Sequence, residues 1–172
     1  MPKLCGALLV ISTCSAMGYL ASQRLAERSR LLKLWIWVLE LIKTEICFQS
    51  RLLPEVFCKV ADWCGDPEVG RAFSELAAAV GYGSAREFSD VWQGFVTAEI
   101  WRALKPPELQ TLRELGTFLG STGREDQLVK LNACRSLLEQ LLQAAETEQR
   151  QQTGLYRYFG FAAGVTLVLW LG

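Results

Sequence analysis

The residue of this sequence best placed to do chemistry is Glu45, the one carboxylate on an otherwise apolar helical stripe. Because the chain has no histidine, acid–base catalysis would depend on carboxylates or lysines. Acting with Asp62, Glu68 or Asp126 in one concave pocket, Glu45 could serve a membrane-bound hydrolase or an ion-binding protein. A helix cap, a partner for an arginine on a neighbouring helix or an interface contact is the more common role for such a residue, so both interpretations stay open.

Motifs of the common nucleotide-binding and hydrolytic enzymes are missing. The sequence contains no phosphate-binding loop, no G-x-G-x-x-G and no nucleophile elbow. The glycine-rich run from Gly116 to Gly123 precedes a helix, but no strand precedes it and it does not end in Gly-Lys-Ser/Thr. We therefore expect no enzymatic activity, no catalytic residue and no cofactor.

Composition and cysteine spacing argue against two further classes of protein, nucleic-acid binders and metalloproteins. The 18 basic residues balance 18 acidic ones, which argues against nucleic acid as a partner because nucleic-acid binders show a basic excess. None of the six cysteines forms a C-x-x-C pair, and without histidine a zinc site would need cysteine and carboxylate ligands alone. We expect no metal site, and reduced thiols in a cytoplasmic compartment.

Two apolar runs near the ends of the chain predict transmembrane helices over residues 4–23 and 154–172. The first run holds no charged residue, and about 20 residues of helix span about 30 Å, the thickness of the bilayer hydrocarbon. The second run has Arg157 near its start, where a long side chain can reach the headgroups. Tyr158 and Trp170 bracket this run as aromatic rings do at the two membrane interfaces.

Three other interpretations of the first run fit less well. A buried soluble helix of this length would carry more polar residues. A cleaved signal peptide would have a more basic start than Lys3 and small residues before the cleavage site. A lipoprotein cleavage site before Cys14 matches only in part. We therefore expect a membrane anchor.

Basic residues between the two runs predict the orientation. Because positive charge stays on the cytoplasmic side, the two membrane helices should form a hairpin, with residues 24–153 in the cytoplasm and residues 1–3 exported. Only Lys3 lies on the far side of the first run. The basic residues that follow the first run are Arg24, Arg28, Arg30 and Lys33.

The middle of the chain predicts an all-α fold, a cytoplasmic bundle of six helices over residues 24–153. Apolar residues recur at spacings of three and four, and no stretch alternates as a strand would. The first of these helices covers residues 24–50. No glycine or proline interrupts the chain between Gly18 and Pro54, so the first membrane helix can continue directly into it.

Caps and helix breakers predict the other helix boundaries. The six tryptophans are expected mainly in the core and at the membrane interface, so an exposed one would indicate a docking surface. The boundary residues are Pro54 for the second helix, Asp66 and Pro67 for the third, Ser84 with Glu87 for the fourth, Lys105 to Pro107 for the fifth, and Thr122 with Glu125 for the sixth.

Several short motifs follow one another along the chain in an order that resembles the stage III sporulation protein AB family of endospore-forming bacteria. The resemblance depends on their order over the whole length; residues 62–103 match only loosely, and Arg30 stands where the family usually has proline. The motifs are Lys3-Leu4-x-Gly6-Ala7-x-Leu9, Gly18-Tyr19, Glu27-Arg28, Leu39-Glu40-x-x-Lys43-x-Glu45-Ile46, Leu53-Pro54, Leu115-Gly116-x-x-Leu119-Gly120 with Gln127, and Gly160-Phe161-x-Ala163-Gly164.

The resemblance implies a component of the sporulation channel that links the mother cell to the engulfed forespore, located in the mother-cell membrane around the forespore. It implies a cytoplasmic helical domain similar to the platform protein F of type II secretion. The implied cytosolic partner is similar to the stage III protein AA, a secretion-type ATPase, and the other membrane proteins of the same stage III A operon are further partners. The protein would then be a non-enzymatic platform or adaptor.

In that setting, charged residues near the membrane and a polar turn are the candidates for contact with partners. Reversing the charges of Glu27 and Arg28 should abolish recruitment to the complex while the domain still folds. Self-association of the domain stays open. The candidate interaction residues are Glu27, Arg28, Arg30, Glu40, Glu45, Gly116, Gly120 and Gln127.

Overall fold

The computed structural model describes most of the 172-residue chain. Its described part is all-helical, with no strand, as the sequence predicts. The backbone is described for residues 2–48, 52–81, 87–119 and 123–171, and the side chains for residues 23–46, 52–81, 87–119, 123 and 125–151. The elements are α1 (Pro2–Phe48), α2 (Leu53–Trp63), α3 (Pro67–Gly81), α4 (Phe88–Val96), the 3-10 helix η1 (Glu99–Trp101), α5 (Pro106–Phe118) and α6 (Arg124–Leu171).

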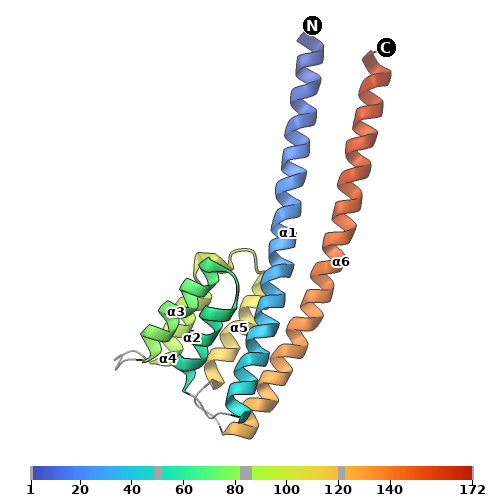
Figure 1. Cartoon of the computed structure of the whole chain (residues 1–172). Helices are drawn as coiled ribbons and strands as arrows, with labels where there is room; N and C mark the ends of the chain where they lie inside the picture. Colours follow the sequence, from blue (N-terminus) through green and yellow to red (C-terminus); the bar gives the residue numbers. More distant parts are fainter. Residues whose placement is uncertain (1, 49–51, 82–86, 120–122, 172) are drawn as a thin grey trace. The chain divides into compact units, whose positions relative to one another are not determined.

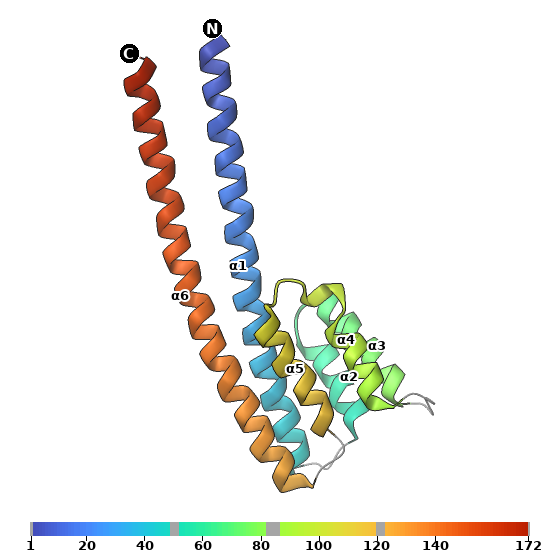
Figure 2. The same cartoon turned by 180° about the vertical axis from the view of Figure 1, so that it is seen from behind.

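The chain forms two compact units. Residues 30–142 make one, called here the helical domain, and the terminal unit comprises the chain up to Ser29 and from Gln143 onward. The long helices α1 and α6 contribute to both units. Within the helical domain, α2, α3, α4 and α5 cluster beside the blue-green segment of α1 (Figures 1 and 2).

The two predicted membrane segments, 4–23 and 154–172, lie outside the residues whose side chains are described, apart from Gln23. Among the residues that the structure describes, no helix has a stretch long and apolar enough to cross a bilayer. The membrane hairpin therefore stays a prediction from the sequence.

Aromatic rings form the centre of the helical domain. Trp35 of α1 is fully buried, and its ring centroid lies 5.0 Å from that of Trp101 and 6.1 Å from that of Trp92. The indole N–H groups of the two partner rings are satisfied internally, because Trp92 Nε1 donates to the Leu112 carbonyl at 2.7 Å and Trp101 Nε1 donates to the Phe95 carbonyl at 2.9 Å. Large apolar rings with satisfied polar ends stabilise a small domain efficiently.

The predicted cap of the third helix is confirmed. α3 begins at Pro67, and the Asp66 carboxylate accepts hydrogen bonds from the backbone N–H of Glu68 at 2.9 Å and of Val69 at 3.2 Å. Gly65 has φ +68°, a left-handed conformation that glycine adopts at low cost, so the chain can turn sharply between α2 and α3.

The predicted cap of the fourth helix is wrong. Glu87 is extended (φ −63°, ψ 144°) and precedes the first residue of α4, whereas a capping box would need it three positions inside the helix. The helix begins at Phe88, whose half-buried ring lies with its centroid 5.8 Å from that of Trp92, while Glu87 is exposed. The partner residue Ser84, like Thr122 of the last predicted capping box, lies outside the described residues.

The predicted start of the fifth helix is confirmed, with a contact that the sequence did not reveal. α5 begins at Pro106, and the backbone N–H of Lys105 donates to the Glu108 carboxylate at 2.6 Å. Glu108 is fully buried, and this hydrogen bond from its carboxyl group holds the first turn of α5.

Candidate functional site

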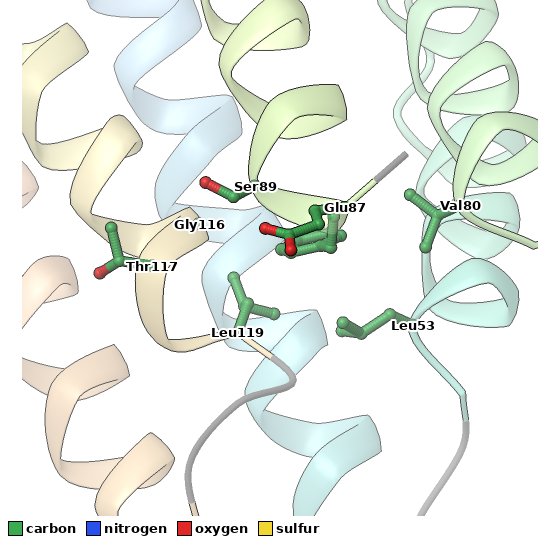
Figure 3. A pocket seen from close by; sticks show the side chains of 8 residues that line it. Leu53, Val80, Glu87, Ser89, Gly116, Thr117 and Leu119 are labelled. Carbon is green, nitrogen blue, oxygen red and sulfur yellow. The ribbon is translucent and has the colours of Figure 1, made fainter. Parts of the chain in front are cut away.

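The end of the helical domain where four helices meet contains an open hollow of about 510 Å³. The first residues of α2 and α4 and the last turns of α3 and α5 form its walls, as Figure 3 shows. The lining residues are Leu53, Val80, Glu87, Phe88, Ser89, Gly116, Thr117 and Leu119.

The lining that the structure describes is mainly apolar and includes one carboxylate, that of Glu87. Glu87 is exposed, and two hydroxyl groups, of Ser89 and Thr117, are the other polar side chains in the lining. Aliphatic and aromatic walls with a single carboxylate can accept an apolar side chain of a partner protein whose neighbouring lysine or arginine pairs with the carboxylate. Protein partners commonly insert anchor residues of this kind. The described residues contain no cluster of three or more side chains that could hold a metal ion.

Gly116 forms part of the wall of this hollow, at a position where any larger side chain would clash. A Cβ atom at this position would lie 2.0 Å from Cδ1 of the Trp92 ring. The glycine therefore lets α5 approach the central aromatic cluster, and it gives the hollow a wall of backbone next to Thr117.

Glu45 has a structural partner. Its side chain is 4% exposed, and its carboxylate accepts a hydrogen bond from Lys59 Nζ at 2.5 Å. Asp62 and Glu68 are exposed, and Asp126 pairs with a lysine one turn along α6, so none of the three lines the hollow. The four carboxylates of the hydrolase hypothesis thus do not gather in this pocket.

Two candidate arginines pair with acids far along the chain. In the terminal unit, Arg28 is 5% exposed and donates to the Glu148 carboxylate of α6 at 2.7 Å, next to a Ser29–Gln149 hydrogen bond of 3.2 Å. In the helical domain, Arg30 pairs with the Asp66 carboxylate. That hydrogen bond is the main reason why the pKa of Asp66 lies below its ordinary value.

Other candidate residues connect helices within the domain. Glu40 of α1 pairs with Arg135 of α6 at 2.8 Å, and the buried Gln127 side chain donates to the Phe118 carbonyl at 3.4 Å. Glu27 is half-buried in the terminal unit, and Gly120 lies outside the described residues. Of the seven candidates that the structure describes, only Gly116 lines the hollow, and an interaction role stays a prediction for all eight.

The profile of the stage III sporulation protein AB family matches residues 3–171, nearly the whole chain. The chain belongs to this family. A relative named stage III sporulation protein AB, from Bacillus subtilis (strain 168), is 25% identical over 173 residues, which cover 99% of each chain. No solved structure matches the chain. The family resemblance inferred from the short motifs is thereby confirmed.

Membership of the stage III sporulation protein AB family makes this a sporulation protein. It also connects the hollow with the motifs that carried the family resemblance. Two of the motifs quoted for the family contribute to its walls, Leu53-Pro54 through Leu53, and the stretch from Leu115 to Gly120 through Gly116 and Leu119. The sequence did not predict Glu87 as a site residue, because its pattern had assigned Glu87 to a helix cap. The signal that could have indicated this pocket was the pair of family motifs, Leu53-Pro54 and Leu115 to Gly120, that contribute to its walls.

Proposed function

We propose that this protein is a non-enzymatic membrane platform of the mother cell–forespore sporulation channel, which docks a secretion-type ATPase to membrane-embedded subunits. Family membership supplies the process. The observation that carries the docking role is the open hollow of the helical domain, lined by residues of two family motifs.

The walls of the hollow suit a docking role better than small-molecule chemistry. Its volume falls within the range of about 300–1,000 Å³ typical of binding pockets. Trp92 lies directly behind Gly116 and is 1% exposed, so the wall is backed by a packed ring and offers a preformed surface. Preformed pockets bind anchor side chains at a lower entropic cost than mobile ones.

The proposed location is the mother-cell membrane around the forespore, with residues 4–23 and 154–172 in the bilayer and the helical domain in the cytoplasm. The two apolar runs and the basic residues that follow the first of them support this arrangement. The helical backbone of α1 covers residues 4–23 and that of α6 covers residues 154–171, which agrees with membrane helices.

The proposed partners are an ATPase similar to the stage III protein AA and the other membrane proteins of the stage III A operon. Because Glu87 is the one carboxylate among the described lining residues, we expect the ATPase to present an apolar side chain and a lysine or arginine to it. Contacts to membrane subunits would involve the two terminal helices.

The decisive experiment measures binding of the ATPase to the full chain in detergent. Glu87→Lys should weaken binding about tenfold, because a repulsive contact replaces an attractive one. A tenfold change corresponds to about 1.4 kcal/mol of binding free energy. Glu99→Lys is the matched control, since Glu99 is 85% exposed and lies in η1, away from the hollow. Equal binding by the wild type and both variants would contradict docking at the hollow.

Charge reversal at Glu27 and Arg28 tests a different property. Because Arg28 is buried and paired with Glu148, its reversal breaks an internal ion pair between α1 and α6. Loss of recruitment in that variant would report on the terminal unit, so the Glu87 variant is the cleaner test of the docking surface.

A further inference from the structure

The end of α5 forms one wall of the hollow, and the helix stops there. Gly116, Thr117 and Leu119 are the wall residues from this segment, as labelled in Figure 3. Leu119 is extended (φ −63°, ψ 117°), so no further turn of α5 supplies N–H groups to the last carbonyls of the helix. One of these carbonyls belongs to the buried Phe118, between two wall residues. A buried carbonyl needs a hydrogen-bond donor from elsewhere.

A glutamine of α6 supplies that donor. The Gln127 side chain is 9% exposed, and its Nε2 donates to the Phe118 carbonyl at 3.4 Å. The backbone of Gln127 is itself fixed at the start of α6, because its N–H donates to the Gly123 carbonyl at 3.0 Å. Three residues further on, Lys130 Nζ lies 5.7 Å from the centre of the Phe118 ring, a cation–π contact. One face of α6 therefore holds Phe118 at two points.

Gln127 can affect the hollow only through α5. It is not one of the described lining residues, so its side chain does not form part of the wall. Without its amide, the end of α5 would keep the backbone hydrogen bond of 3.2 Å from Leu119 to Leu115 but lose this tie to α6. Helix ends open more easily than helix interiors, and a binding site loses affinity when the contacts that support its walls are removed.

We propose that Gln127 is a positioning residue for the docking hollow, because its amide fixes the Phe118 carbonyl and thereby the α5 wall that the ATPase contacts. The proposal rests on the docking function proposed above. It assigns Gln127 a different role from the direct partner contact expected from the sequence, since the side chain is buried and bonded inside the domain.

The test compares Gln127→Leu with the wild type, using the full chain in detergent. Leucine can fill the buried position but cannot donate a hydrogen bond to Phe118. Two quantities are measured, the hydrogen-exchange rate of the Leu119 backbone N–H and the affinity for the ATPase. Exchange should become about fivefold faster and binding about fivefold weaker.

Thr111→Val is the matched control. Thr111 is 3% exposed, and its hydroxyl donates to the Pro107 carbonyl at 3.0 Å, so valine also removes a buried hydrogen bond from a side chain to a carbonyl. That bond lies in the first turns of α5, and Thr111 is not a described lining residue. This variant should keep the wild-type exchange at Leu119 and the wild-type affinity.

Lys130→Gln removes the second contact with Phe118 from the surface. Because the Lys130 side chain is 42% exposed, this variant tests the same tie even where Gln127→Leu destabilises the whole domain. It should shift both quantities in the same direction, by about twofold.

The outcomes separate this inference from the proposed function. Faster exchange together with weaker binding in Gln127→Leu, and neither change in Thr111→Val, supports the inference. Unchanged binding in Gln127→Leu overturns it, whether or not exchange is faster, and docking at the hollow stands if Glu87→Lys still weakens binding. If Glu87→Lys binds as well as the wild type, docking at the hollow fails and the positioning role fails with it.

Discussion

Replacing Gly116 by alanine should destabilise the helical domain, although alanine is the better helix former. The new Cβ would lie 2.0 Å from Trp92 Cδ1, and an ordinary contact begins at 3.4 Å. The ring or the helix would have to move by about 1.4 Å to remove this overlap in a densely packed interior.

The Trp92 ring has little freedom to move. Its centroid lies 6.0 Å from that of Phe57 and 5.6 Å from that of Phe95, and its N–H donates to the Leu112 carbonyl at 2.7 Å. Overpacking a core in this way costs about 1–3 kcal/mol. Loss of the hydrogen bond adds about 1 kcal/mol, and the helix preference of alanine returns up to about 1 kcal/mol. The expected net loss is therefore about 1–3 kcal/mol.

The measurement is denaturant unfolding of the full chain in detergent, followed by tryptophan fluorescence. Gly94→Ala is the matched control, because Gly94 is an exposed position within α4 and a Cβ there meets nothing within 4 Å. This variant should gain about 0.5–1 kcal/mol. If Gly116→Ala is as stable as Gly94→Ala, the close contact with Trp92 does not explain the glycine, and the reasoning is refuted.

Two further predictions concern the ionised groups of the domain. Asp66→Ala should lower the free energy of unfolding by about 1–2 kcal/mol at neutral pH, through loss of the α3 cap. Because the pKa of Asp66 is held below its ordinary value of 3.8, chiefly by the Arg30 hydrogen bond, the part of this stabilisation that depends on the charge is complete above pH 3.8 and is lost as the pH falls toward the lowered value. The difference in unfolding free energy between wild type and variant should therefore shrink in acid, and a constant difference would contradict this. Lys59→Met should cost about 3 kcal/mol because Glu45 stays buried without its ammonium, and adding Glu45→Gln should restore part of the loss in the same unfolding assay. If Glu45→Gln alone abolished function at unchanged stability and ATPase binding, the carboxylate-dependent hydrolase would become the better hypothesis.

Local sequence chemistry predicted much of the secondary structure. The caps at Asp66 and Pro67 and the break before Pro106 were found because each depends on residues no more than three positions apart. The start of the fourth helix was predicted wrongly because Glu87 fits a local cap pattern, whereas the helix begins one residue later, at Phe88, whose half-buried ring packs on Trp92.

The candidate site was predictable only in part. Gly116 was chosen from a motif, but its reason, the Trp92 ring 24 positions earlier, is a contact between α4 and α5 that no local pattern contains. Glu45 stood out as a carboxylate on an apolar stripe, and the sequence left open whether it was catalytic. Its partner Lys59 comes from the next helix, so the packing of α2 against α1 decided the answer.

The sequence by itself determined the helical class and the family, because these depend on periodicity and on the order of short motifs. It also carries the whole argument for the two membrane segments. The tertiary structure decided which side chains meet. The Arg28–Glu148 pair joins residues 120 positions apart, and the hollow takes its walls from four separate helices. Such contacts follow from how α2 to α6 fold back on α1, and a linear pattern of residues does not contain that information.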